Sequence, residues 1–184
     1  TIQQLLTHTS GYRPDFDLGE KWTGRDGMLA ALKKERLRNL PGTKFVYSDI
    51  GFEILGELVE RISGKSLQYF ARQNIQIGED TDFRLRPEFN VNSTGGPNLP
   101  GERRNDRWIR IAPTENIRGQ NSYLGLVFEG DDKTGTEILR GQVHDPTAFR
   151  MGGVAGHAGL FSTADDLARY CQMILNGGIV PATT

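Results

Sequence analysis

Residues 41–64 read PGTKFVYSDIGFEILGELVERISG. Apolar residues recur after Asp49 at the 3.6-residue spacing of an amphipathic helix, and glycine, here Gly64, is common just past a helix C-terminus. The stretch therefore predicts a helix that begins after Asp49 and ends at Gly64. Tyr47 and Ser48 come just before it, so a phenol, a hydroxyl and a carboxylate are expected together at the helix N-terminus, where backbone N–H groups are unpaired. This is a candidate polar site.

The same helix has an apolar side and a polar side. Glu57 and Arg61 stand four residues apart on the polar side, which predicts a surface ion pair. The apolar side is expected to pack into a core and consists of Ile50, Ile54, Leu55, Leu58, Val59 and Ile62.

The composition limits the kind of protein this is. With 184 residues, the chain is long enough for one domain with a hydrophobic core. Its net charge of −1, with both signs interspersed, argues against a nucleic-acid partner. No apolar run approaches the roughly 20 residues that cross a bilayer, so neither a membrane span nor a signal peptide is expected. Cys171 is the single cysteine, which excludes an internal disulfide, and it is expected to be buried on an apolar helix stripe.

The rest of the chain predicts an α+β fold that is mainly helical. Gly, Pro and Asn dominate residues 78–120, which predicts a long loop, and strands at 123–128 and 137–143 around a turn at 131–135 predict a hairpin. No internal repeat is visible, so residues 1–184 are expected to be one unit. Four more helices, capped by Thr1, Asp26, Ser66 and Thr163, are expected at 2–7, 27–38, 67–77 and 164–175.

One triplet and three longer segments of this sequence carry a resemblance to a known family. The triplet Tyr47-Ser48-Asp49 resembles the Tyr-x-Asn second motif of serine β-lactamases, penicillin-binding proteins and related esterases. Ile2–Gly11, which contains Leu-Leu-Thr-His-Thr-Ser-Gly, is similar to another segment of that family. Ser48–Gly64 looks like the family's helix after the tyrosine, and Gly156–Tyr170 looks like its later Gly-Leu-x-Ser-Thr-Ala-x-Asp-Leu segment. The segments occur in the family's order.

The resemblance implies a fold and a place for this chain within it. The family's β-lactamase/transpeptidase-like architecture is an α+β fold in which a sheet is flanked by helices, with a helical subdomain beside it. This chain begins at Thr1, within a motif-like stretch, and looks like an internal fragment that contains the helical subdomain and its loops. The resemblance also implies the bacterial periplasm or cell envelope, with the cytoplasm as the alternative.

The resemblance also implies a chemistry. In this family a serine attacks an acyl carbon, and the covalent acyl-enzyme is then hydrolysed. The substrate would be a D-Ala-D-Ala peptide, a β-lactam or a small ester, with no metal or organic cofactor. Tyr47 would be the general base and acid, with Ser48 and Asp49 beside it as further catalytic candidates. Asp49 stands where the family has asparagine, and because a carboxylate only accepts hydrogen bonds, we expect it to hold the family's lysine rather than a substrate amide.

The nucleophile of that chemistry is missing from this sequence. No serine is followed by lysine three positions later, and no Gly-x-Ser-x-Gly elbow occurs. We therefore expect the chain to be inactive alone and its parent to be a serine hydrolase. Since a subdomain cut from its sheet exposes apolar surface, a homodimer is also expected. The serines checked are Ser10, Ser48, Ser63, Ser66, Ser93, Ser122 and Ser162.

Two stretches compete for the family's third motif. Lys133-Thr134-Gly135 matches Lys-Thr-Gly letter for letter, but it lies in a polar run typical of a hairpin tip. His157-Ala158-Gly159 fits His-x-Gly but runs straight into the cap at Thr163. His157 and Gly159 are therefore predicted to lie at the edge of the substrate cleft or to serve packing.

The remaining polar residues support weaker alternatives. His8, His144, Asp145 and His157 match no standard zinc spacing, so no metal is expected, and Asp145 is predicted to cap a helix. The arginines between residues 103 and 110 form either a solvated face or a site for an anionic ligand. The alternative to a hydrolase is a non-catalytic module that binds cell-wall or peptide ligands, and a catalytically dead relative is a third.

Overall fold

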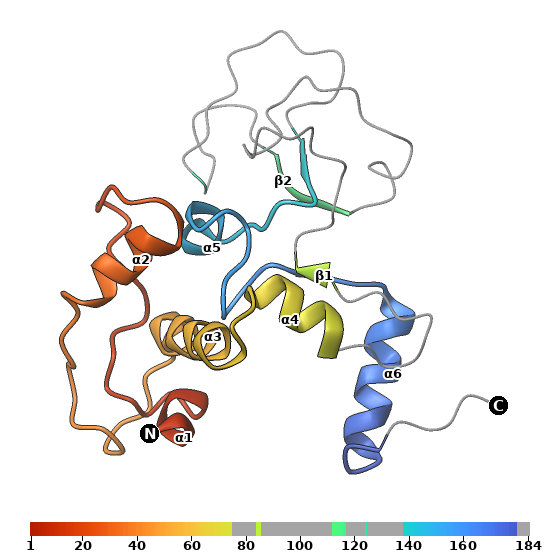
Figure 1. Ribbon diagram of the computed structural model, residues 1–184, viewed down its shortest axis with the longest axis horizontal. Coiled ribbons are helices and arrows are strands. Elements are labelled where there is room, and N and C mark those ends of the chain that lie inside the picture. Colours follow the sequence, from red (N-terminus) through yellow and green to blue (C-terminus); the bar gives the residue numbers. More distant parts are fainter. Residues whose placement is uncertain (75–83, 86–111, 117–123, 125–137, 180–184) are drawn as a thin grey trace, which may run out of the picture.

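The computed structural model describes residues 1–74, 84–85, 112–116, 124 and 138–179 (Figure 1). Within these ranges the chain forms helices and short strands, in agreement with the α+β class predicted from the sequence. The helices are α1 (Ile2–Leu6), α2 (Gly24–Leu32), α3 (Asp49–Ser63), α4 (Leu67–Asn74), α5 (Pro146–Arg150) and α6 (Ala164–Leu175). The strands are β1 (Arg84–Leu85), β2 (Pro113–Asn116), β3 (Ile138–Arg140) and β4 (Leu160–Phe161).

Helices α1, α2, α3 and α5 gather into one layer that contains the candidate site (Figure 1). The predicted capping box at Thr1 is present, and α1 packs against α3. Ser48 caps α3, and Gly64 ends it with φ of 67°, a left-handed conformation that glycine adopts without a Cβ penalty. The helix predicted from residues 41–64 is therefore confirmed at both ends.

Helix α2 differs from the prediction at both ends. It begins at Gly24, so Asp26 lies in its first turn and does not cap it, and it ends at Leu32 rather than near Arg38. The chain leaves α2 early because neighbouring segments hold the residues that follow. Glu35 is ion-paired with Arg13, and the backbone N–H of Arg38 donates to the carbonyl of Gly11 at 2.7 Å.

The strands form two small antiparallel pairs. Strand β1 pairs with β4, and β2 pairs with β3 through a register irregularity between Pro113 and Glu115. Strands β1 and β2 both lie in the span 78–120 that was predicted to be one loop, and that part of the prediction is wrong. Strand β3 corresponds to the predicted strand 137–143. The predicted strand 123–128, apart from Leu124, and the turn at 131–135 lie outside the described residues.

Two apolar clusters hold the helical layer together. The first has Phe16, Met28, Ala31 and Ile50 at its centre, with Trp22 packed beside them. The second consists of Val143, Ala148 and Ala155. Met151 packs against both, so α5 and the segment after it are joined to α2 and α3.

The buried side of α3 overlaps the apolar side predicted from the sequence only in part. Ile50 is fully buried and Ile54 packs beside it, as predicted, but the far end of that side is exposed. Ile62 is 78% exposed, whereas Glu53 is 1% exposed and Glu57 is also buried. Glu57 does form the predicted pair with Arg61, at 2.5 Å, but it also accepts two hydrogen bonds from Arg25. The carboxylates can be buried because cations from other segments meet them there.

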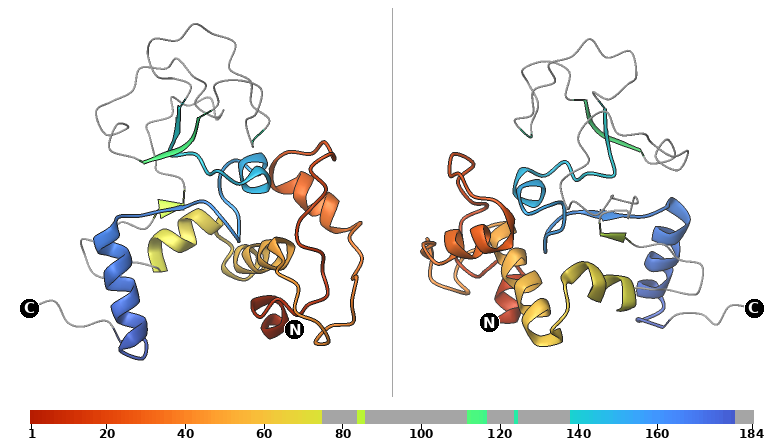
Figure 2. Two further views of the ribbon diagram at one scale, coloured as in Figure 1. Left: turned by 180° about the vertical axis from the view of Figure 1, so that it is seen from behind. Right: turned by 45° about the horizontal axis from the view of Figure 1, so that its top comes forward.

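Helix α6 stands apart from the helical layer in the views of Figures 1 and 2. Thr163 caps it as predicted, and Asn176 follows its last turn. Cys171 is exposed, so the prediction that it is buried is wrong. The apolar stripe of α6 faces outward, with Leu167, Ile174 and Leu175 exposed. Among the described residues, the structure contains no helix that is both long and apolar enough to span a membrane.

Candidate functional site

The loop from His8 to Pro14 presents the triplet Tyr47-Ser48-Asp49 at the start of α3. The N–H of Val46 donates to the carbonyl of His8 at 2.8 Å, and the N–H of Asp49 donates to the carbonyl of Pro14 at 2.7 Å. These two hydrogen bonds flank the triplet. They fix its backbone against the loop.

The side chain of Ser48 is turned into the protein. Ser48 is buried, and its Oγ donates to the carbonyl of Arg13 at 2.7 Å and accepts from the N–H of Gly51 at 3.3 Å. The second bond is the N-cap of α3. These two hydrogen bonds give Ser48 a structural role.

Tyr47 points outward and lies against His8. Tyr47 is 59% exposed, and its ring centroid lies 4.5 Å from that of His8. The ring of His8 also stacks on that of Phe52, with the centroids 5.1 Å apart, and its Nδ1 accepts from the N–H of Ser48 at 3.0 Å. His8 therefore braces the phenol from below, with its ring proton on Nε2.

His8 is a site residue that the sequence analysis did not single out. Its backbone has a φ of 54°, which is uncommon for a non-glycine residue and places the ring beneath Tyr47. The available signal is its position within the segment Leu-Leu-Thr-His-Thr-Ser-Gly. From the sequence alone, His8 is considered only as a metal ligand, and no metal is expected there.

The charges around Tyr47 keep its phenol protonated. The carboxylate of Asp49 raises the pKa of Tyr47, and partial burial and a hydrogen bond to Asp49 raise it further. Asp145 acts in the same direction from a greater distance. Because an opposite charge has the reverse effect, a cation placed beside the hydroxyl would lower this pKa and turn the phenol into a usable base.

His157 lies behind these residues, between two carboxylates. Its side chain is 5% exposed, with Nε2 2.8 Å from Oδ1 of Asp145 and Nδ1 2.7 Å from Oε1 of Glu53. Burial alone would lower the pKa of this imidazole, but the hydrogen bonds and charges of Asp145 and Glu53 outweigh it and raise the pKa to about 10. His157 is therefore an imidazolium at neutral pH.

The two carboxylates respond in opposite directions. Burial raises the pKa of Glu53 and is only partly offset by His157 and by the N–H of Gly156. Burial also acts on Asp145, but its bonds to His157 and to the N–H of Ala148 bring the pKa of that carboxyl below its ordinary value. Asp145 is the N-cap of α5, as predicted from the sequence. It is thus both a helix cap and the anionic partner of His157.

A third and a fourth carboxylate approach the same place. Asp15 accepts from Oγ1 of Thr147 at 3.0 Å, and burial raises its pKa, with Asp145 and Asp49 adding to the effect. Potential ligand atoms of Asp49, Asp145 and His157 all lie within 4.8 Å of one another. A metal would need His157 as a neutral imidazole. Since both ring nitrogens face carboxylates, these residues fit a charge-balanced cluster better than a metal site.

The glycine-rich segment before α6 packs tightly on α3. A Cβ at Gly156 would lie 1.9 Å from the carbonyl oxygen of Phe52, so only glycine fits. Gly159 has a φ of 113°, and a Cβ there would lie 2.5 Å from the carbonyl oxygen of Gly153. Gly159 therefore shapes the turn, whereas His157 supplies a charge inside the protein.

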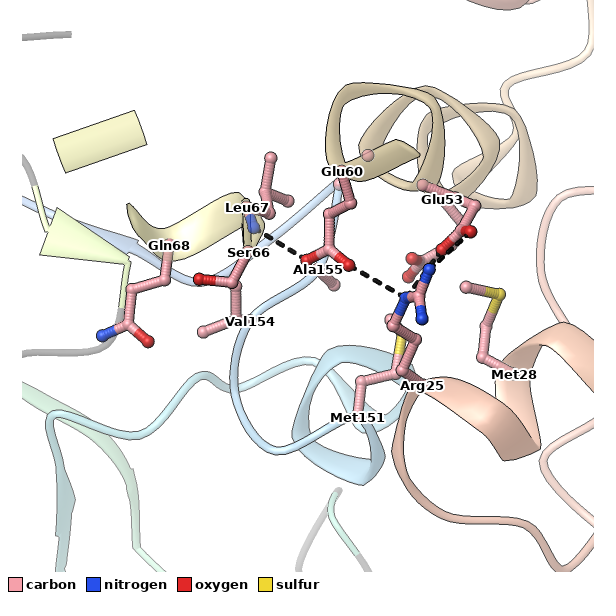
Figure 3. A pocket seen from close by; sticks show the side chains of 13 residues that line it. Arg25, Met28, Glu53, Glu60, Ser66, Leu67, Gln68, Met151, Val154 and Ala155 are labelled. Carbon is pink, nitrogen blue, oxygen red and sulfur yellow. Dashed lines mark hydrogen bonds and ion pairs between the residues drawn. The ribbon is translucent and has the colours of Figure 1, made fainter. Parts of the chain in front are cut away.

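A cavity of about 150 Å³ lies beyond Glu53 (Figure 3). Arg25 reaches into it from α2 and pairs with Glu57 and with Glu60 at 2.9 Å, while Glu60 also accepts from the N–H of Leu67. Its other walls are mostly apolar, with Met28 and Met151 on one side. Arg25, Glu57 and Glu60 therefore pair with one another inside this cavity, whereas the phenol of Tyr47 is exposed.

Two sequence predictions concern residues outside the described ranges: Lys133-Thr134-Gly135 and the arginines between residues 103 and 110. His144, by contrast, lies within the described ranges, directly before Asp145. Its Nε2 lies 3.8 Å from Oε1 of Glu115.

Comparison with known sequences identifies relatives along the whole chain. A family model described as Beta-lactamase matches residues 1–184. A protein of Escherichia coli strain K12, provisionally named D-alanyl-D-alanine carboxypeptidase, is 34% identical over 185 residues, covering 96% of this chain and 39% of the relative. A Bacillus subtilis strain 168 protein named N-acetylmuramyl-L-alanine amidase is 38% identical, covering 96% of this chain and 38% of the relative.

Solved structures show the same architecture. A class C β-lactamase matches 100% of this chain and 39% of its own chain, with a TM-score of 0.56 and 19% identity. D-amino acid amidase from Ochrobactrum anthropi SV3, in complex with D-phenylalanine, matches 98% of this chain and 46% of its own, with a TM-score of 0.55 and 17% identity. At these identities the likeness concerns the fold alone, and it confirms the predicted β-lactamase-like fold.

The chain spans 38–39% of the length of the curated relatives it matches. Within that span the match includes the three segments from which the resemblance was inferred. Because the family model extends over all of residues 1–184, the chain belongs to the β-lactamase family.

Proposed function

We propose that the whole protein is a serine hydrolase that cleaves an amide or ester through an acyl-enzyme, with Tyr47 as general base and acid. The observation that carries the proposal is the exposed phenol of Tyr47, braced by His8 beside Asp49 at the start of α3, in a chain of the β-lactamase family. The buried bonds of Ser48 argue that it shapes this site rather than attacks substrate.

The proposed reaction begins outside these 184 residues. A serine of a Ser-x-x-Lys motif, which this sequence lacks, attacks the acyl carbon while Tyr47 takes its proton. Tyr47 then gives that proton to the leaving amine or alcohol as the acyl-oxygen or acyl-nitrogen bond breaks. A water molecule, deprotonated by the same phenolate, releases the acid product and regenerates the serine. By this scheme the 184 residues alone are inactive.

Asp49 has a defined part in this scheme. Its carboxylate raises the pKa of Tyr47, which opposes base catalysis unless a cation sits between them. The lysine of Ser-x-x-Lys would provide that cation, with Asp49 accepting its hydrogen bond. An ionised carboxylate cannot donate to a substrate carbonyl, so Asp49 would not bind an amide as asparagine does.

The proposed substrate is a peptidoglycan-like peptide that ends in D-Ala-D-Ala. The support is the name of the E. coli relative, and the name of the B. subtilis relative, an amidase, favours amide over ester substrates. A bacterial periplasm or cell-envelope location follows from such a substrate. Homodimerisation through the exposed apolar side of α6 stays a prediction.

The test uses the full-length protein and the Tyr47→Phe variant. We expect release of D-alanine from a D-Ala-D-Ala peptide to fall by about 10²–10⁴-fold in the variant, the range typical of losing a general acid–base group. Tyr69→Phe is the matched control, since Tyr69 is exposed on α4 and its loss should leave turnover unchanged. Retained turnover in Tyr47→Phe would refute the role of Tyr47. Peptide binding without any turnover by the natural protein would favour the non-catalytic module.

A further inference from the structure

His157 connects the two helices whose first turns meet at the candidate site. Its Nδ1 faces Glu53 of α3, and its Nε2 faces Asp145, the cap of α5. Glu53 follows Asp49 by four residues, so both lie on the same side of α3, one turn apart. The ring is therefore one turn behind the carboxylate that contacts Tyr47.

We propose that His157 is a positioning residue of this active site: it fixes the N-terminal part of α3 against α5, and its charge balances the carboxylates that face Tyr47. The proposal rests on the hydrolase function proposed above. It extends that function to a buried residue that touches neither the phenol nor, by its burial, the substrate.

The geometry supports positioning by a ring held between two carboxylates. Nε2 of His157 forms a hydrogen bond with Asp145 at 2.8 Å, and the 2.7 Å contact of Nδ1 with Glu53 is an ion pair that lacks hydrogen-bond geometry. One charged ring can thus hold two carboxylates from two helices. The segment that carries His157 is itself fixed, because Gly156 lies against the carbonyl of Phe52 and its N–H stabilises the carboxylate of Glu53. The ring thus cannot follow α3 or α5 if either shifts alone.

The charges support the electrostatic part of the proposal. Several described groups face this ring or act on its partners. They are the carboxylates of Glu53 and Asp49 on α3, of Asp145 at the start of α5 and of Asp15 in the loop between α1 and α2, together with the phenol of Tyr47. His157 is the cation among the groups of this cluster, and its raised pKa of about 10 keeps it charged across the neutral range. Without it, the site around Tyr47 becomes more negative by one charge.

The kinetic test compares His157→Gln with His144→Gln in the full-length protein. Glutamine keeps a polar side chain but removes the charge, which should raise the pKa of the base and move the acid limb of the kcat/KM profile upward by about one pH unit. His144→Gln is the same substitution at an exposed ring 3.8 Å from Glu115 and should leave the profile in place. An unchanged profile in His157→Gln, with or without a lower maximum, would overturn the electrostatic role.

A second variant separates charge from packing. Glu53→Gln combined with His157→Gln removes one charge of each sign, so the acid limb should return toward its wild-type position even if activity stays low. A limb that remains shifted in the double variant would contradict charge balance as the cause.

A measurement on the wild-type protein keeps the proposal testable if these variants do not fold. Nitrogen-15 NMR of the histidine rings should show His157 doubly protonated at pH 8.5. A neutral His157 ring at that pH would overturn the proposal. If instead Tyr47→Phe keeps full turnover while His157 is doubly protonated, it is the proposed function that fails.

Discussion

On folding, the imidazolium of His157 loses contact with water and gains contact with two carboxylates. The free energy of unfolding should therefore depend on pH. The folded pKa of about 10 is well above the ordinary value of 6.5 in an unfolded chain. A raised pKa stabilises the fold fully below pH 6.5, and that stabilisation is lost as the pH rises toward 10. At acid pH the pair weakens from the other side as Glu53, whose pKa is raised by burial, takes up a proton.

We therefore expect the difference in unfolding free energy between the wild type and His157→Gln to be greatest near pH 6 and smaller by on the order of a few kcal/mol at pH 10. Urea unfolding of the full-length protein at pH 6, 8 and 10 measures it. A difference that stays constant across this range would mean that His157 is neutral in the folded state.

Single residues also show how far the sequence could be read. Tyr47 and Asp49 were identifiable because local order alone places them at a helix N-terminus. Glu53 and His8 were not identifiable, because their roles come from contacts between residues far apart in the sequence. Glu53 contacts His157, 104 residues later, and His8 contacts Tyr47, 39 residues later. Asp145 was predicted as a cap, but its bond to His157 adds a role that no local pattern contains.

At the scale of elements, the crossing of α3 with the glycine-rich segment determines where His157 lies. Gly156→Ala would bring a Cβ to 1.9 Å from the carbonyl of Phe52, so the backbone must move. We expect the substitution to lower the unfolding free energy by about 3 kcal/mol, in the upper range for overpacking. It should also reduce turnover, since the His157 ring moves with the segment.

Gly64→Ala is the matched control on the same helix. A Cβ there meets open space, and only the left-handed φ of 67° is disfavoured, so the cost should be about 1 kcal/mol with turnover unchanged. Denaturant unfolding and turnover assays on both variants test the crossing. Equal losses of stability for the two would show that the contact at Gly156 relaxes easily.

The elements differ in how well the sequence predicts them. The start and end of α3, the capping box of α1 and the cap of α6 follow from side chains within three residues of each terminus, and these predictions are confirmed. The end of α2 and the buried side of α3 depend on partners far away in sequence. Glu57 reads as a surface residue until Arg25 is seen to meet it.

At the scale of the molecule, the described helices correspond to part of the fold of longer relatives. Helix α6 exposes Leu167, Ile174 and Leu175, and the chain spans 38–39% of the length of its relatives. An apolar side of this kind is ordinarily covered, by further chain or by another copy. The proposed role of Tyr47 likewise requires a further group, because carboxylates raise the pKa of this phenol and a base would need a cation beside it.

The central claim is that Tyr47 serves a nucleophilic serine that lies outside these 184 residues. The most direct measurement is peptide mapping by mass spectrometry after the full-length protein reacts with a β-lactam or a D-Ala-D-Ala thioester. The account predicts one acyl adduct, on a serine of a Ser-x-x-Lys motif beyond residues 1–184, which forms at least about 100-fold more slowly in Tyr47→Phe. An adduct on a serine within residues 1–184, or one that forms at the wild-type rate without the phenol, would contradict it.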